Sequence, residues 1–111
     1  MTPVKAADGT TVQKITITNG PARAQLISYG ATLTDFRLDG MPYSLALGSP
    51  DPESYFGKMR YFGAIVGPIA NRIAQGQALL DGKSLKLAVN ENGNALHGGP
   101  EGISQKNWQV E

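Results

Sequence analysis

Apolar and polar residues alternate along several short stretches of this chain of 111 residues. In residues 12–18 (VQKITIT), Ile15 and Ile17 fall on one face and polar side chains fall on the other. Residues 22–26 (ARAQL) and 85–89 (LKLAV) repeat the alternation. Because successive side chains of a strand point to opposite faces of its sheet, this pattern predicts β-strands that are buried on one side.

Asp-Gly and Asn-Gly pairs separate these stretches. They lie at residues 8–9, 19–20, 39–40, 81–82 and 92–93. Such pairs tolerate positive φ and are strong hairpin signals between alternating segments. The chain is therefore predicted to be all-β, an antiparallel meander with a turn about every 8–12 residues.

One short helix is predicted to interrupt the strands, over residues 51–56. Asp51 is a favourable N-cap, Pro52 suits the first helical position, and Glu53 lies near the positive end of the helix dipole. Gly57 is expected to end this helix after one or two turns.

Residues 90–111 contain two further signals. Residues 90–104 are polar and rich in glycine, which predicts a long loop of the kind that often carries binding residues. Residues 107–111 (NWQVE) begin another alternation at the end of the chain. A strand is expected to start there, and the chain is expected to be part of a longer protein.

The charge balance indicates what kind of partner to expect. Ten basic and nine acidic residues give a formal net charge of +1, without a basic stripe or an acidic tail. Nucleic acid and anionic membrane surfaces are therefore not expected partners, and a neutral ligand suits the chain better. With no cysteine and one histidine, no disulfide, zinc site or other metal site is expected, and no cofactor.

The sequence contains no apolar run near the ~20 residues that a membrane span needs. Residues 1–13 lack the apolar core of a signal peptide. We therefore predict a cytosolic location, and a periplasmic protein with a removed signal peptide is the alternative.

Asn71 and Arg72 are the first candidate site residues. Arginine offers five N–H donors in a fixed geometry, and asparagine offers both a donor and an acceptor. Together they suit the neighbouring hydroxyl groups of a sugar ring. The simpler alternative is that Asn71 is a turn residue and Arg72 an exposed strand residue.

His97 is the only histidine of the chain, and it lies 25 positions after Arg72. Leu96 is expected to anchor it in the core, and residues 98–100 (GGP) are expected to form a turn that fixes its backbone. An imidazole held in this way can form hydrogen bonds with a hydroxyl group or a ring oxygen. A surface histidine without such a role is the alternative, and Glu101 lies near enough in sequence to pair with it.

Six motifs in order resemble the N-terminal part of the aldose 1-epimerase (galactose mutarotase) family. They are residues 28–33 (SYGATL), Leu47 and Gly48 followed by Tyr55, residues 61–64 (YFGA), 67–73 (GPIANRI), 80–87 (LDGKSLKL) and 94–99 (NALHGG). Pro68 is one departure, because many relatives carry arginine there.

The resemblance implies an antiparallel β-sandwich of the galactose mutarotase type, with residues 1–111 as the N-terminal segment of a single domain. It implies conversion between the α- and β-anomers of free hexoses such as galactose or glucose. Asn71, Arg72 and His97 would bind the sugar. The family's catalytic acid and base, a second histidine and a glutamate, would lie beyond Glu111, so no catalytic residue is expected here and the chain alone is expected to be inactive.

Two other classes of protein remain open at this point. One is a non-catalytic β-sandwich module that binds carbohydrate, and the other is a purely structural β-domain. The expected partner is a free aldohexose, with no nucleic acid and no membrane. Self-association through open sheet edges, such as the β-branched residues 15–18, is a further expectation.

Overall fold

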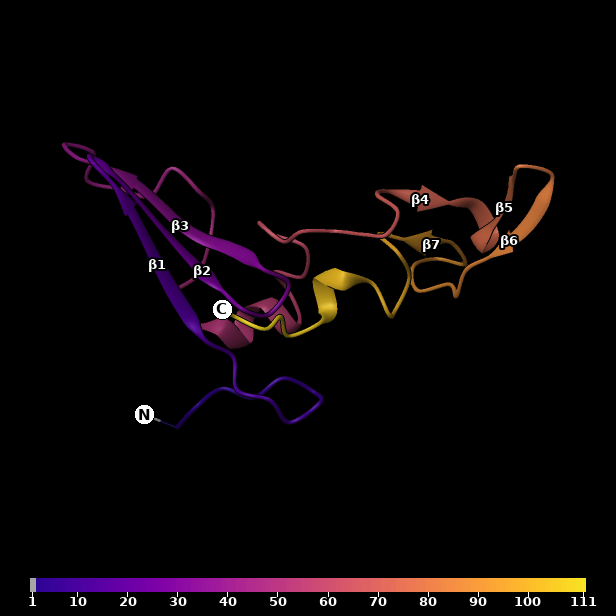
Figure 1. The fold of residues 1–111 in the computed structure, drawn as a ribbon, viewed down its shortest axis with the longest axis horizontal. Coiled ribbons are helices and arrows are strands. Elements are labelled where there is room, and N and C mark those ends of the chain that lie inside the picture. The colour runs from indigo at the N-terminus through magenta and orange to yellow at the C-terminus, as the bar shows by residue number, and fades with distance from the viewer. Residues whose placement is uncertain (1) are drawn as a thin grey trace.

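Short antiparallel strands provide most of the regular structure in residues 2–111, which a computed structural model describes (Figure 1). One sheet holds β1 (Lys14–Asn19), β2 (Ala22–Ile27) and β3 (Thr32–Leu38) in that order. Two smaller sheets pair β4 (Arg72–Ile73) with β7 (Ala95–Leu96) and β5 (Gln77–Leu80) with β6 (Lys83–Lys86). Three short 3₁₀ helices complete the fold: η1 (Pro52–Phe56), η2 (Ala74–Gly76) and η3 (Ile103–Gln105). The predicted all-β class is confirmed.

The meander of β1, β2 and β3 follows the predicted alternation. β1 and β2 are joined at the pair Asn19 and Ala22, and Gly20 in the turn between them has a φ of 55°. β2 also pairs with β3 in antiparallel orientation, and the register of this pair shifts between Gln25 and Leu26. The strand predicted over residues 22–26 is therefore confirmed, and the strand predicted over residues 12–18 is confirmed from Lys14 on.

Two Asx-Gly pairs form tight hairpin turns in the second half of the chain. Asp81 and Gly82 have φ values of 50° and 75° and join β5 to β6. Asn92 and Gly93 have φ values of 47° and 78° and close a bridge between Glu91 and Asn94. Positive φ at both central residues is the requirement of a type I′ turn, which suits these residue types.

The strand predicted over residues 85–89 is wrong beyond Lys86. β6 ends there because its partner β5 begins only at Gln77. Gly76, with a φ of 67°, turns the chain just before β5, and its carbonyl accepts one further hydrogen bond, from the Leu87 N–H at 2.7 Å. Residues 88 and 89 have no place in this ladder.

The helix predicted over residues 51–56 is confirmed as η1, with 3₁₀ geometry. The Asp51 carboxylate accepts a hydrogen bond from the Glu53 N–H at 3.1 Å, and Gly57 is the C-cap. The buried Tyr55 fixes η1 to the preceding loop, because its hydroxyl accepts the Ser49 N–H at 2.8 Å.

Two predictions for the end of the chain need correction. Residues 90–104 are not one loop, because they contain β7 and the start of η3. Residues 107–111 form no strand: Asn107 makes an isolated bridge with Tyr29, and the Trp108 N–H bonds the Ser28 carbonyl at 2.9 Å. Residues 107 and 108 face the turn at residues 28–31, between β2 and β3. This turn is too short to pair with a full strand.

The hydrophobic core lies beside the three-stranded sheet. Its buried members come from the N-terminal loops, β2 and η1, and Ile27 is only 2% exposed: Ala6, Val12, Ile27 and Tyr55. Other large apolar side chains lie open, such as Ile17 at 56% and Leu79 at 78%. None of the helices formed by residues 2–111 is long and apolar enough to cross a membrane.

The chain is elongated, with a radius of gyration of 16.3 Å against roughly 13 Å for a compact domain of about 100 residues. The three-stranded sheet lies at one end and the β5–β6 hairpin at the other (Figure 1). Backbone hydrogen bonds connect the two parts, from the Ile65 N–H to the Gly30 carbonyl at 3.0 Å and from the Ile103 N–H to the Gly67 carbonyl at 3.1 Å. The pair of β4 and β7 is therefore held between two structured regions.

Candidate functional site

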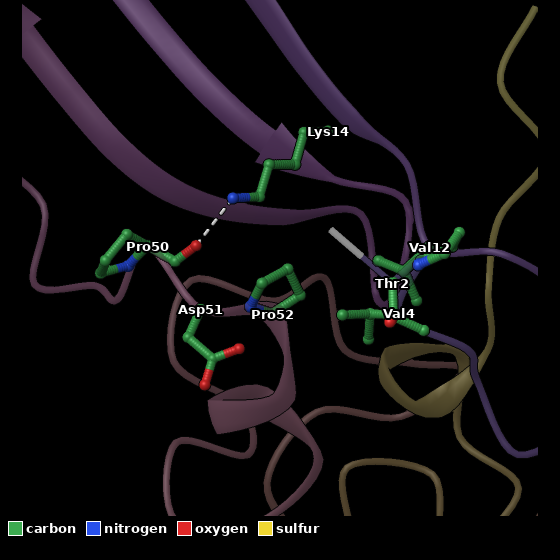
Figure 2. A pocket seen from close by; sticks show the side chains of 8 residues that line it. Thr2, Val4, Val12, Lys14, Pro50, Asp51 and Pro52 are labelled. Carbon is green, nitrogen blue, oxygen red and sulfur yellow. Dashed lines mark hydrogen bonds between the residues drawn. The ribbon is translucent and has the colours of Figure 1, made fainter.

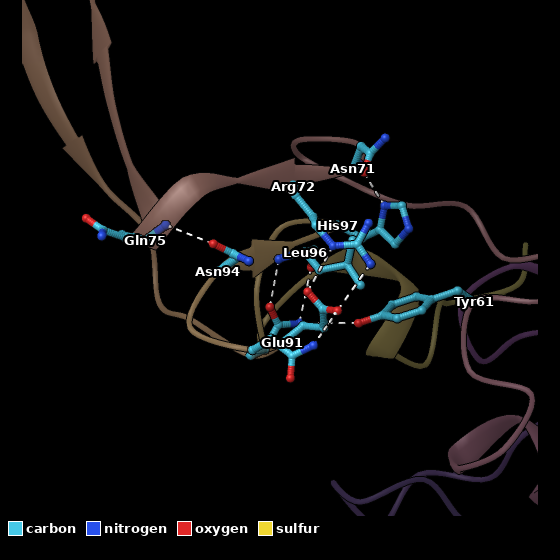
Figure 3. Close-up of polar contacts among 10 residues, drawn as sticks. Tyr61, Asn71, Arg72, Gln75, Glu91, Asn94, Leu96 and His97 are labelled. Carbon is cyan, nitrogen blue, oxygen red and sulfur yellow. Dashed lines mark hydrogen bonds and ion pairs between the residues drawn. The ribbon is translucent and has the colours of Figure 1, made fainter.

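The pairing of β4 with β7 brings the three predicted site residues together (Figure 3). Arg72 lies opposite Leu96 in the ladder. One position further, the His97 N–H donates to the Asn71 carbonyl at 3.0 Å. The Asn71 N–H donates in return to Nδ1 of the His97 ring at 2.9 Å. Direct hydrogen bonds thus hold His97 beside the Asn71–Arg72 pair, although His97 lies 25 positions after Arg72 in the sequence.

Glycine makes the turn after His97 possible. His97 itself has a φ of 51°, and Gly98 and Gly99 follow at 88° and 78°. A Cβ on Gly98 would lie 2.2 Å from the Gly67 carbonyl oxygen, so no side chain fits there. Leu96 is buried. The predicted anchor at Leu96 and the predicted turn over residues 98–100 are confirmed.

The hydrogen bond from Asn71 determines the tautomer of the His97 ring. Because Nδ1 accepts a hydrogen bond from the Asn71 N–H, the neutral ring carries its own proton on Nε2. The Tyr61 ring packs against the imidazole edge to face, with centroids 4.8 Å apart and planes at 68°. The ring is therefore held on two sides, and Nε2–H is available as a donor.

Asn90 fixes Tyr61 to the outer edge of β7. Its side-chain oxygen accepts the Leu96 N–H at 2.7 Å, and its amide nitrogen donates to the Leu96 carbonyl at 3.2 Å. The same amide nitrogen donates to the Tyr61 hydroxyl at 3.2 Å. One side chain thus takes the place of a neighbouring strand and also positions the aromatic ring beside His97.

Arg72 forms a bidentate ion pair with Glu91, a residue that the sequence analysis did not identify. Arg72 Nε lies 2.9 Å from Glu91 Oε2, and Nη2 lies 3.1 Å from Oε1. These hydrogen bonds lower the pKa of Glu91 and raise that of Arg72. Only knowledge of the β4–β7 pairing would have placed Glu91, 19 positions away, next to Arg72.

Several hydrogen-bond donors remain open at this ladder. Two of the five N–H groups of Arg72 bond Glu91, and the other three have no partner among residues 2–111. The Asn71 side chain is likewise without a hydrogen bond in the described part of the chain, and Asn71 is exposed. With Nε2–H of His97, these groups can bind the oxygen atoms of a neutral hydroxylated ligand, and Tyr61 offers an aromatic ring beside them.

The sequence suggested that Glu101 could pair with His97, but the structure does not contain this pair. It forms an ion pair with Lys106 on the surface, and a hydrogen bond from Lys106 lowers the pKa of Glu101. Across residues 2–111, no cluster of three or more His, Asp or Glu side chains is placed to hold a metal ion.

A larger groove lies elsewhere in the described chain, between the N-terminal segment and η1 (Figure 2). It encloses about 430 Å³ and is lined largely by apolar side chains such as Val4, Val12 and Pro52. The one cation in its lining, Lys14, already donates to the Pro50 carbonyl at 2.8 Å. With few open polar groups, this groove suits a sugar less well than the β4–β7 ladder.

Comparison with known proteins identifies relatives of this chain. The family model described as aldose 1-epimerase matches residues 13–111. The chain is 42% identical over 101 residues to galactose mutarotase of Bos taurus, and 36% identical over 113 residues to aldose 1-epimerase of Escherichia coli (strain K12). These alignments cover 88% and 98% of this chain, but 30% and 33% of the two relatives. The chain thus spans about a third of the length of the curated relatives it matches.

Two solved structures resemble the fold closely. Galactose 1-epimerase from Lactobacillus acidophilus NCFM matches 96% of this chain and 32% of its own, with a TM-score of 0.77 and 30% identity. An aldose epimerase homologue from C. elegans matches 91% of this chain and 32% of its own, with a TM-score of 0.80 and 30% identity. The fold class is therefore the antiparallel β-sandwich of these epimerases, as the sequence predicted.

The ion pair predicts a change in the titration of Glu91. Arg72 holds the pKa of Glu91 below its ordinary value of 4.5, so the pair favours the folded state above that pH and the benefit disappears as the pH falls through the folded-state pKa. We expect Arg72→Gln to raise the pKa of Glu91, as measured by NMR titration of its side-chain carboxyl carbon. Asp35, which pairs with Arg37, is the internal control and should not move. An unchanged Glu91 titration would show that the pair does not form in solution.

Proposed function

Because the chain belongs to the aldose 1-epimerase family, we propose that it supplies the sugar-binding part of an enzyme that interconverts the α- and β-anomers of a free hexose. In this proposal residues 1–111 are the N-terminal segment of one β-sandwich domain. Galactose and glucose are the proposed substrates, and a cytosolic location stays a prediction from the sequence.

The observation that supports sugar binding most directly is the set of open donors at the end of the β4–β7 ladder. Three N–H groups of Arg72 and Nε2–H of His97 can donate to hydroxyl or ring oxygens, and the Asn71 amide can donate or accept. The charge of Arg72 is offset by Glu91, so a neutral sugar fits this surface better than a phosphorylated one. The ring of Tyr61 adds an apolar face beside His97.

Anomer exchange needs a base for the proton of the anomeric hydroxyl and an acid for the ring oxygen. His97 can donate from Nε2, but its Nδ1 is occupied by the Asn71 N–H. It therefore cannot accept one proton and donate another in the same step. We propose that the acid and the base come from residues outside this chain, and that Asn71, Arg72 and His97 hold the sugar for them.

A non-catalytic module that binds carbohydrate is the second candidate. The same open donors support it, because they require no further residues to bind a sugar. The two candidates differ in turnover, so mutarotation kinetics separates them, whereas sugar binding alone does not.

The first prediction concerns Arg72 and His97 in a chimera in which this chain replaces the matched third of the Escherichia coli aldose 1-epimerase. Arg72→Ala should lower kcat/KM for galactose by roughly 10- to 150-fold, the equivalent of ~1.5–3 kcal/mol for a hydrogen bond from a charged group. His97→Ala, which removes a neutral donor, should lower it by roughly 2- to 13-fold, the equivalent of ~0.5–1.5 kcal/mol. Polarimetry of fresh α-galactose measures the rate. Arg37→Ala, on β3, removes a similarly exposed arginine from another sheet and should leave the rate unchanged. Wild-type kinetics in both site variants would contradict the assignment.

The second prediction concerns the chain of 111 residues alone. We expect it not to accelerate the change of optical rotation of fresh α-galactose or α-glucose, because His97 alone cannot serve as both acid and base. An inert protein at equal concentration is the control. Acceleration above that control would place a complete acid–base pair within this chain.

The third prediction concerns self-association, which we propose for the chain in isolation. β1 is an edge strand in the described structure, with unpaired backbone groups, and Ile17 and Leu79 are exposed apolar side chains. Size-exclusion chromatography with light scattering should show a mass that rises with concentration. Ile17→Lys, which places a charge on the edge strand, should reduce this association. A folded monomer at ~0.1 mM would contradict the proposal.

A further inference from the structure

We propose that Glu91 is a positioning residue, which orients Arg72 so that its three open N–H groups face the sugar. This inference rests on the proposed function, because it concerns the same site. It assigns a role to a residue outside the sugar-binding set of Asn71, Arg72 and His97.

The geometry of the pair favours this role. Glu91 bonds the Nε side of the guanidinium, through Nε at 2.9 Å and Nη2 at 3.1 Å. The Nη1 group and the second hydrogen of Nη2 stay open. Because a guanidinium is planar and rigid, fixing one edge fixes the direction of the other. Arg72 is thus ordered before a ligand arrives, which removes part of the entropy cost of binding.

Glu91 is itself fixed by the turn that follows it. The type I′ turn at Asn92 and Gly93 pairs Glu91 with Asn94, whose N–H bonds the Glu91 carbonyl at 2.8 Å. The Asn92 side chain donates to Glu91 Oε1 at 3.2 Å. The Asn94 side chain accepts the Gln75 N–H at 3.2 Å, which ties this turn to the segment directly after β4 (Figure 3). The carboxylate is therefore held relative to the strand that carries Arg72.

Exposure distinguishes a positioning role from a stabilising one. The side chain of Arg72 is 53% exposed and that of Glu91 is 28% exposed. Ion pairs so open to water contribute little to folding, because solvent screens the charges. The main consequence of this pair is thus the direction of the guanidinium, and Glu91→Gln should leave the fold nearly as stable as before.

A double-mutant cycle tests the inference in the chimera described above, with KM and kcat for galactose as readouts. We expect Glu91→Gln to raise KM roughly 5- to 50-fold with a smaller change in kcat, since it acts through ligand binding by Arg72. In the Arg72→Ala background, Glu91→Gln should change KM by less than about twofold. Glu101→Gln is the matched control, because Glu101 also pairs with a surface cation, Lys106, and should have no effect.

A second readout needs no sugar and uses the full chain of 111 residues. The Nε–H signal of Arg72 in an NMR spectrum should exchange slowly with water in the wild type and much faster in Glu91→Gln. Glu91→Asp, which keeps the charge but shortens the reach, should fall between the two in both KM and exchange rate. If Glu91→Gln proves unstable, Glu91→Asp tests the inference instead, and a KM and an exchange rate equal to those of the wild type would overturn it.

The outcomes separate this inference from the proposed function. Glu91 does not act through Arg72 if Arg72→Ala raises KM but Glu91→Gln does not. The same holds if the fold-change in KM of the double variant equals the product of the two single fold-changes. Either result overturns this inference and leaves the proposed function standing. If Arg72→Ala leaves KM unchanged, the proposed sugar-binding role of Arg72 falls, and the inference falls with it. Fast exchange of the Arg72 signal in the wild type would also overturn the inference.

Discussion

The hydrogen bonds between Asn71 and His97 are the contact on which the candidate site depends. They join two segments that are far apart in sequence, one by a backbone bond and one through the imidazole itself. The same pair of bonds extends the β4–β7 ladder by one position and sets the tautomer of His97. Both residues have positive φ, an arrangement that most side chains disfavour, so the surrounding turns must hold them. The close approach of Gly98 to Gly67 supplies much of that constraint.

Three exposed ion pairs of the described chain illustrate how surroundings decide what a charge pair can do. Arg37 with Asp35 and Lys106 with Glu101 link near neighbours in sequence. Arg72 with Glu91 instead links two chain segments beside an aromatic ring, a histidine and a buried strand. The chemistry of the three pairs is similar. In the third pair, the open donors of Arg72 lie next to Asn71 and His97, which can bind the same ligand.

Sequence reasoning was reliable where the structure is local. Residues 14–18 and 22–26 alternate strictly, and Asp81 and Gly82 form the turn that their side chains favour, so β1, β2 and the β5–β6 turn were predictable. Of the strand predicted over residues 85–89, only residues 85 and 86 lie in β6. β4 and β7 contain two residues each, which is too short for any periodic pattern, and their pairing depends on contacts across the chain. The family resemblance named Arg72 and His97 without showing that they touch a common ladder. Glu91 and Asn90 could not be found for the same reason, because their partners are set by that pairing.

The separation of the hydrophobic core from the candidate site has a consequence for dynamics. The core is built from the first sixty residues, whereas the only buried residues of the β4–β7 ladder are its own Ala95 and Leu96. Segments with few buried contacts open at a lower free energy than the whole molecule unfolds. The β4–β7 ladder can therefore open briefly from its ordered form while the core stays intact. A bound ligand would then raise the free energy of this local opening as well as that of global unfolding.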